Sequence, residues 1–116
     1  MSRRSVVSIV KGQDLGEMTK RSIDLLGGLT DIVSGGDLVL IKPNLVGALP
    51  SSTGVSSDPK IVETLVEMCW KFGAGEVIIG EGSGGVETSV AFRGCGYEEV
   101  ARRTGANLVD LNRDHV

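Results

Sequence analysis

Residues 38–44 read LVLIKPN, a continuous apolar run that ends in a lysine and a proline. Four apolar residues without polar alternation are typical of a strand covered on both faces, as in a parallel sheet. Pro43 has no N–H to donate to a neighbouring strand, so it ends the strand. The stretch therefore predicts a buried parallel strand at residues 38–42.

Three other short runs have the same β-branched, apolar character. They predict further strands at residues 5–10, 76–80 and 107–111. Capped helical patterns lie between them: Asp14 precedes the first, and Asp58-Pro59 begins the second. Two shorter helices are expected between residues 88 and 104.

The alternation of strands and helices decides the fold class. No hairpin signal joins any two strands, so parallel strands with right-handed helical crossovers are expected. The prediction is an α/β fold: a doubly wound, mostly parallel four-stranded sheet with helices on both faces, a Rossmann-like or flavodoxin-like half. Strand order 2-1-3-4 is favoured over 3-2-1-4.

Composition limits the classes of function. The 116 residues correspond to a single domain, and 41% apolar residues can form a core. A net charge of −3 argues against a nucleic-acid surface, and no apolar run is long enough to cross a membrane. Two cysteines cannot form a disulfide framework, so a reducing cytoplasm is the expected compartment.

The end of the sequence suggests a missing continuation. The fourth predicted strand ends near Leu111, and no crossover helix follows to cover it. We expect the chain, residues 1–116, to be one α/β domain and the N-terminal portion of a longer protein. Aliphatic surface should then stay exposed, which favours a homo-oligomer, and substrate should bind weakly to this chain alone.

A glycine-rich turn follows the third predicted strand. The stretch GEGSGG at residues 80–85 fits G-x-G-x-x-G between a strand and a helix, where glycines let backbone N–H groups approach a phosphate. Against a dinucleotide site, Glu81 adds a negative charge, and Asp110 is 30 residues beyond Gly80, not the usual ~20. Three readings stay open: a dinucleotide site, a site for another small ligand, and a plain tight turn.

The carboxyl ends of parallel strands share one edge of the sheet, where ligands of such folds bind. The predicted ligand-binding residues therefore lie on one rim: Lys42, Asn44, Gly80, Glu81, Gly82 and Ser83, with Asp110 as a further candidate. In the favoured strand order Lys11 and Gly12 join them. The alternative is a solvated Lys42 and an Asn44 that bonds its own turn.

Two further expectations concern the loops and the remaining polar residues. The loop at residues 45–57 is rich in Ser, Thr and Gly, and we expect it to be mobile because it has little apolar surface to hold it down. Asp110, Asn112 and Asp114 could offer oxygen ligands to a cation, but exposed residues at a strand end are the favoured reading, and no metal site is assigned. His115 supports no triad, so catalytic residues are unassigned.

Several motifs together resemble a known family. They are IKPNLV at residues 41–46, Asp58-Pro59, GEGSG at residues 80–84, Gly96-Tyr97 and VDLN at residues 109–112. Their order and spacing resemble the amino-terminal part of the family called domain of unknown function 362. By position, Lys42, Asn44, Glu81, Ser83 and Asp110 match its polar motif positions.

The resemblance also implies a redox context. Many members of that family carry or accompany ferredoxin-like iron–sulfur modules. The cluster-binding cysteines are absent from this chain, so no cofactor is expected in it, and an iron–sulfur cluster would lie elsewhere in the full-length protein.

Two functions follow as hypotheses. The first is the ligand-binding half of a larger, redox-linked enzyme whose ligand is small and anionic. The alternative is a non-catalytic scaffold that docks an iron–sulfur electron-transfer partner, such as a ferredoxin-like module.

Overall fold

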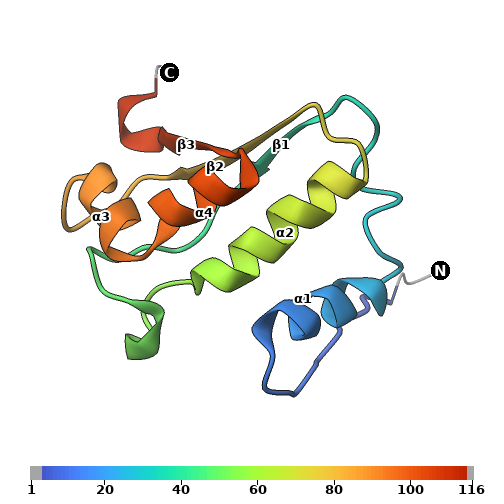
Figure 1. Ribbon diagram of the computed structural model, residues 1–116. Helices are drawn as coiled ribbons and strands as arrows, with labels where there is room; N and C mark the ends of the chain where they lie inside the picture. Colours follow the sequence, from blue (N-terminus) through green and yellow to red (C-terminus); the bar gives the residue numbers. More distant parts are fainter. Residues whose placement is uncertain (1–3, 115–116) are drawn as a thin grey trace.

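The computed structural model describes residues 4–114, and it is an α/β fold (Figure 1). Two helices, α1 (Leu15–Asp24) and α2 (Pro59–Lys71), flank the first strand in sequence. The remaining elements are β1 (Leu38–Ile41), the 3-10 turn η1 (Ser51–Thr53), β2 (Glu76–Glu81), α3 (Thr88–Gly94), α4 (Tyr97–Thr104), β3 (Asn107–Asp110) and the 3-10 turn η2 (Leu111–Arg113).

The sheet is parallel and has β2 at its centre. Its order is β1-β2-β3; Leu38 lies opposite Glu76, and Glu81 lies opposite Asp110. These strands occupy three of the four predicted places, so the parallel α/β prediction is confirmed for them. The register brings the carboxyl ends of all three strands to one edge of the sheet.

The predicted strand at residues 5–10 is wrong for this structure. The segment is extended but belongs to no sheet, and its Val7 and Ile9 are 77% and 88% exposed. It runs beside α1, where the hydroxyl of Ser8 donates to the carbonyl oxygen of Ser22 at 2.8 Å. A β-branched run favours extended backbone, but a strand also needs a partner, and this one has none in the described sheet.

Both predicted strand orders are wrong for the same reason. Each of them placed the strand at residues 5–10 inside the sheet, next to the strand at residues 38–42. In the structure β1 is an edge strand that pairs directly with β2. Lys11 and Gly12 therefore do not join the rim, and Gly12 lies instead against Met18 of α1.

The core lies on one face of the sheet. Apolar side chains that point to α2 and α4 form it together with those helices; from the strands they are Val39, Ile41, Val77, Ile79 and Leu108. On the opposite face Leu38 and Leu40 are 63% and 54% exposed. The doubly wound prediction, with helices on both faces, does not hold for the described chain.

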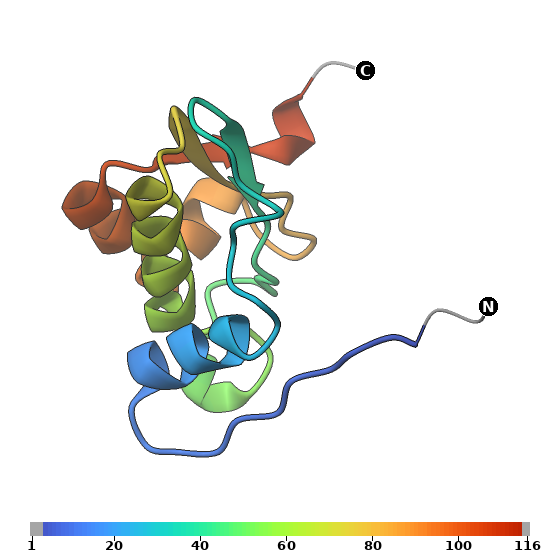
Figure 2. The same ribbon diagram turned by 90° about the vertical axis from the view of Figure 1, so that its right-hand side faces the viewer.

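The helices pack next to one another as a layer. Figures 1 and 2 show α1 and α2 side by side below the sheet. The carboxylate of Glu63 in α2 accepts a 3.1 Å hydrogen bond from Arg103 in α4, and this bond joins α2 to α4. No helix within residues 4–114 is long and apolar enough to cross a membrane.

The predicted helix starts are confirmed by their caps. The Asp14 side chain accepts from the backbone N–H of Glu17, and that of Asp58 accepts from the backbone N–H of Lys60. Asp58 also accepts a 2.6 Å bond from the hydroxyl of Ser51, which lies in η1. One capping residue therefore both begins α2 and holds the preceding loop, which leads back to the end of β1.

Candidate functional site

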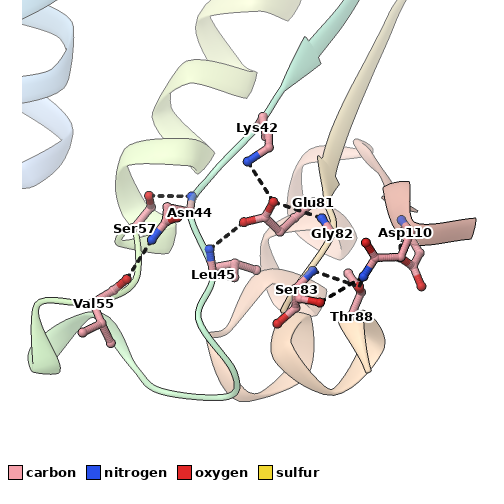
Figure 3. A network of polar contacts seen from close by, with 11 residues as sticks. Lys42, Asn44, Leu45, Val55, Ser57, Glu81, Gly82, Ser83, Thr88 and Asp110 are labelled. Carbon is pink, nitrogen blue, oxygen red and sulfur yellow. Dashed lines mark hydrogen bonds and ion pairs between the residues drawn. The ribbon is translucent and has the colours of Figure 1, made fainter. Parts of the chain in front are cut away.

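Lys42 and Glu81 meet at the carboxyl edge of the sheet (Figure 3). Lys42 follows β1 and Glu81 ends β2, so the pairing of these strands brings them together. Lys42 Nζ lies 2.9 Å from Glu81 Oε1. The lysine side chain is 58% exposed while the glutamate is 5% exposed, so the pair joins a buried carboxylate to a cation that reaches solvent.

Backbone donors hold the Glu81 carboxylate from two more directions. The N–H of Leu45 donates to Oε2 at 2.7 Å, and the N–H of Gly82 donates to Oε1 at 3.0 Å. Burial by itself raises the pKa of Glu81, but the bonds from Lys42, Leu45 and Gly82 outweigh it and lower that pKa below its ordinary value. The residue is therefore a bound carboxylate that ties two loops together.

Asn44 holds its own loop. Its side-chain amide donates to the carbonyl oxygen of Val55 at 2.9 Å, and its backbone N–H donates to the hydroxyl of Ser57 at 3.0 Å (Figure 3). Ser57 in turn donates its N–H to the carbonyl oxygen of Asn44 at 2.8 Å. Of the two readings of Asn44, these contacts match the one in which it bonds its own turn.

The loop at residues 45–57 is also held by Cys95 and Tyr97, which lie between α3 and the start of α4. Leu45 is buried, the Cys95 thiol donates to the carbonyl oxygen of Leu49 at 3.1 Å, and the Tyr97 hydroxyl donates to that of Ser57 at 2.8 Å. Burial, followed by the nearby Cys95, Asp58 and Glu81, raises the pKa of Tyr97 above its ordinary value, so the tyrosine stays a donor. Apart from Leu45 these contacts are hydrogen bonds, and Val46, Leu49 and Val55 stay 48%, 47% and 41% exposed, so polar contacts rather than apolar burial hold this loop.

Two glycines, Gly80 near the end of β2 and Gly82 just after it, are crowded by neighbouring side chains. A Cβ at Gly80 would lie 2.8 Å from a methyl carbon of Leu40, and one at Gly82 would lie 2.5 Å from the side-chain oxygen of Asn112. Gly84 and Gly85 have open space around them. The tight-turn reading therefore accounts for the first half of the motif, and the second half stays accessible.

Ser83 is buried within this turn. Its N–H donates to Thr88 Oγ1 at 3.2 Å, and its carbonyl oxygen accepts from the Asn112 amide at 3.0 Å. Its hydroxyl oxygen has no hydrogen-bond partner within residues 4–114 although the residue is 5% exposed. Buried polar groups nearly always find a partner, so this hydroxyl is the unsatisfied group of the rim.

Asp110 caps the turn that follows β3. It accepts from the backbone N–H of Asn112 at 2.9 Å and lies 3.3 Å from Arg113 Nε. Arg113 also reaches Glu87 at 3.3 Å. These residues line a recess of about 420 Å³ beside the open glycines; its lining is Gly84, Gly85, Val86, Glu87, Thr88, Asp110, Asn112 and Arg113.

The predicted rim thus falls into two groups. Lys42, Asn44 and Glu81 lie with the loop after β1, whereas Ser83 and Asp110 lie with the recess on the other side of the end of β2. Across residues 4–114 no three His, Cys, Asp or Glu side chains are placed to hold a metal ion. His115 lies outside the described residues.

Three members of the site were missed. They are Leu45, Thr88 and Asn112, which connect Glu81 and Ser83 to their surroundings. Leu45 acts through its backbone N–H, for which a sequence carries no signal. The sequence indicates Asn112 only as a possible cation ligand. Its position two residues after the end of β3 is the signal that places it at the carboxyl edge of the sheet.

Comparison with known proteins identifies the family of the chain. The family model described as Domain of unknown function (DUF362) matches residues 39–116, a range that includes Lys42, the turn after β2 and all of β3. Searches of curated proteins and of solved structures give no match to the chain. Because the family model matches most of the chain, the protein belongs to the DUF362 family.

Proposed function

We propose that the chain supplies the ligand-binding rim of an enzyme whose ligand is small and anionic, with Lys42 as its cation. The observation that carries this proposal is the Lys42–Glu81 pair at the carboxyl edge of the sheet. Ligands of open α/β sheets bind outside this edge. A lysine held there by a buried partner keeps a fixed position and still faces solvent.

The charges of the pair support an anionic ligand. A lysine ammonium has three N–H donors, and one of them is used by Glu81. The others are free to bond a carboxylate or phosphate that approaches from solvent. Glu81 already accepts from three donors, so it is a positioning residue for Lys42 and a poor proton acceptor.

The turn after β2 offers a second point of contact. Gly84 and Gly85 are uncrowded, and the Ser83 hydroxyl has no partner in the described chain. The hydroxyl itself is buried, so the part of this turn that a ligand can reach is the exposed backbone of Gly84 and Gly85. Because Gly80 and Gly82 are explained by packing, a general anion is favoured over a dinucleotide.

The wider setting of the proposal comes from the family resemblance. It includes the redox link and an iron–sulfur module elsewhere in the full-length protein, whereas the cytoplasm as compartment rests on the cysteine content. Cys69 and Cys95 are free and buried, which fits a reducing compartment. The second candidate function, a docking scaffold, is favoured by the exposed Leu38 and Leu40 on the uncovered face of β1.

An NMR titration tests the anion site. Phosphate, oxalate and adenosine monophosphate are added in turn to labelled protein, and amide shifts are mapped on the sequence. We expect weak binding with shifts confined to residues 42–45 and 80–85. The Lys42→Ala variant should lose these shifts, whereas Lys71→Ala, an exposed lysine at the end of α2, should keep them.

Two outcomes would contradict the proposal. The first is the absence of localised shifts at the highest ligand concentration that leaves the protein folded. The second is an equal response of the Lys42→Ala and Lys71→Ala variants, which would indicate nonspecific charge screening. Either result would leave docking as the better-supported function.

A further inference from the structure

The segment at residues 5–10, SVVSIV, is an extended strand former without a sheet. Val7 and Ile9 are 77% and 88% exposed, among the most exposed large apolar side chains of the described chain. Ser8 and Val10 face α1 instead. Ser8 bonds Ser22, and Val10 lines a shallow recess together with Leu15 and Met18 of α1. One side of the segment therefore presents apolar side chains to water.

Within residues 4–114, the free edge of β1 lacks a neighbouring strand to pair with. β1 pairs with β2 on one side, and on its other side the described chain provides no strand. Leu38 and Leu40 stand exposed beside this edge. An exposed apolar edge strand is a template for pairing with another extended segment, and native proteins usually cover or charge such edges.

The two features lie apart in one molecule. In both views the sheet is at the top, whereas residues 5–10 run below, beside α1 (Figures 1 and 2). We propose that residues 5–10 of one copy add to the free edge of β1 in a second copy, and that two copies exchange these segments reciprocally. Added strands bind through main-chain hydrogen bonds, with alternate side chains giving specificity.

The flanking charges fit a parallel addition. Arg4 precedes the segment and Asp37 precedes β1, so parallel strands bring opposite charges together where both begin. In that register Val7 lies opposite Leu40, and Lys11 lies opposite the neutral Asn44. Reciprocal exchange also closes the assembly at two copies, because each free segment meets one free edge.

Sedimentation velocity over a concentration series tests the exchange. The unmodified chain should form a dimer in the micromolar range. The double variant Val7→Lys, Ile9→Lys should raise the dimer dissociation constant at least tenfold, because it places two charges on the added strand. Both side chains face water in the single copy, so circular dichroism should show an unchanged fold. The control is Ile32→Lys, 74% exposed and outside the segment, which should leave the dimer intact.

Cysteine cross-linking identifies the occupant of the edge. A Val7→Cys chain is mixed with a Leu40→Cys chain under mild oxidation, and the native Cys69 and Cys95 are buried. We expect a disulfide-linked dimer in this mixture and none when Ile32→Cys replaces Val7→Cys. The proposal is overturned by a monomer at all concentrations, or by a dimer whose dissociation constant is unchanged in the Val7→Lys, Ile9→Lys variant. It is also overturned if a chain that carries both introduced cysteines forms the disulfide only within one molecule.

Discussion

The backbone N–H of Leu45 donates a 2.7 Å hydrogen bond to Oε2 of Glu81, and this contact joins the loop after β1 to the end of β2. The same carboxylate binds Lys42 and the N–H of Gly82. Glu81 is therefore a link between two loops that are far apart in sequence and adjacent at the carboxyl edge of the sheet. The position of Lys42, and with it the proposed anion site, depends on this link.

Replacing Glu81 with glutamine should destabilise the protein. The amide keeps one oxygen acceptor but loses the negative charge and turns an NH₂ group toward donors. We expect a loss of about 2 kcal/mol in the free energy of unfolding, measured by urea denaturation, since removing a partner leaves buried groups unsatisfied. The exposed pair of Arg93 and Glu98 gives the control: Glu98→Gln should cost less than about 1 kcal/mol. Equal losses in the two variants would contradict the role of Glu81.

Stability should fall in acid because of the same carboxylate. The pKa of Glu81 is lower in the folded protein than its ordinary value of 4.5, so the unfolded state takes up the proton first as the pH falls. Its contribution is complete above that ordinary value and is lost as the pH drops through the lower folded pKa. Urea denaturation at pH values on both sides of 4.5 should show a shallower pH dependence for Glu81→Gln than for the unmodified chain. Parallel curves for the two proteins would contradict the assignment.

The strands were predictable where local pattern and tertiary pairing agree. The runs at residues 38–41, 76–81 and 107–110 are strands because each finds a parallel neighbour. Residues 5–10 have the same β-branched pattern and stay outside the sheet. A pattern reports what a backbone prefers, whereas pairing depends on which edge is within reach, and no local signal encodes that.

The site was predictable in part. Lys42 and Glu81 could be placed together because strand ends of a parallel sheet share an edge, and they are in contact. Asn44 could be placed at that edge, but its bond to Val55 depends on how a 13-residue loop folds back. The donors from Leu45 and Gly82 belong to the backbone, so no side chain in the sequence marks them.

Adding a methyl group at Gly82 should disturb the turn. A Cβ there would lie 2.5 Å from the side-chain oxygen of Asn112, whose amide nitrogen bonds the carbonyl of Ser83. We expect Gly82→Ala to lower the free energy of unfolding by about 1–3 kcal/mol, as overpacking does. The matched control is Gly84→Ala, two residues on and uncrowded, which should change stability by less than about 0.5 kcal/mol. A tolerated Gly82→Ala would show that Asn112 moves aside freely.

The unpartnered hydroxyl of Ser83 gives a prediction of opposite sign. Removing a buried polar group that has no partner removes its desolvation penalty, so Ser83→Ala should leave the unfolding free energy unchanged or raise it by up to about 1 kcal/mol. Thr88→Val is the comparison, because Thr88 Oγ1 accepts from the N–H of Ser83 at 3.2 Å. That variant should lose about 1–2 kcal/mol, since it leaves a buried donor unsatisfied. Urea denaturation of both variants checks the pair. If Ser83→Ala is the more destabilised of the two, the hydroxyl has a partner in solution, and a water molecule or bound anion at the rim becomes the explanation to pursue.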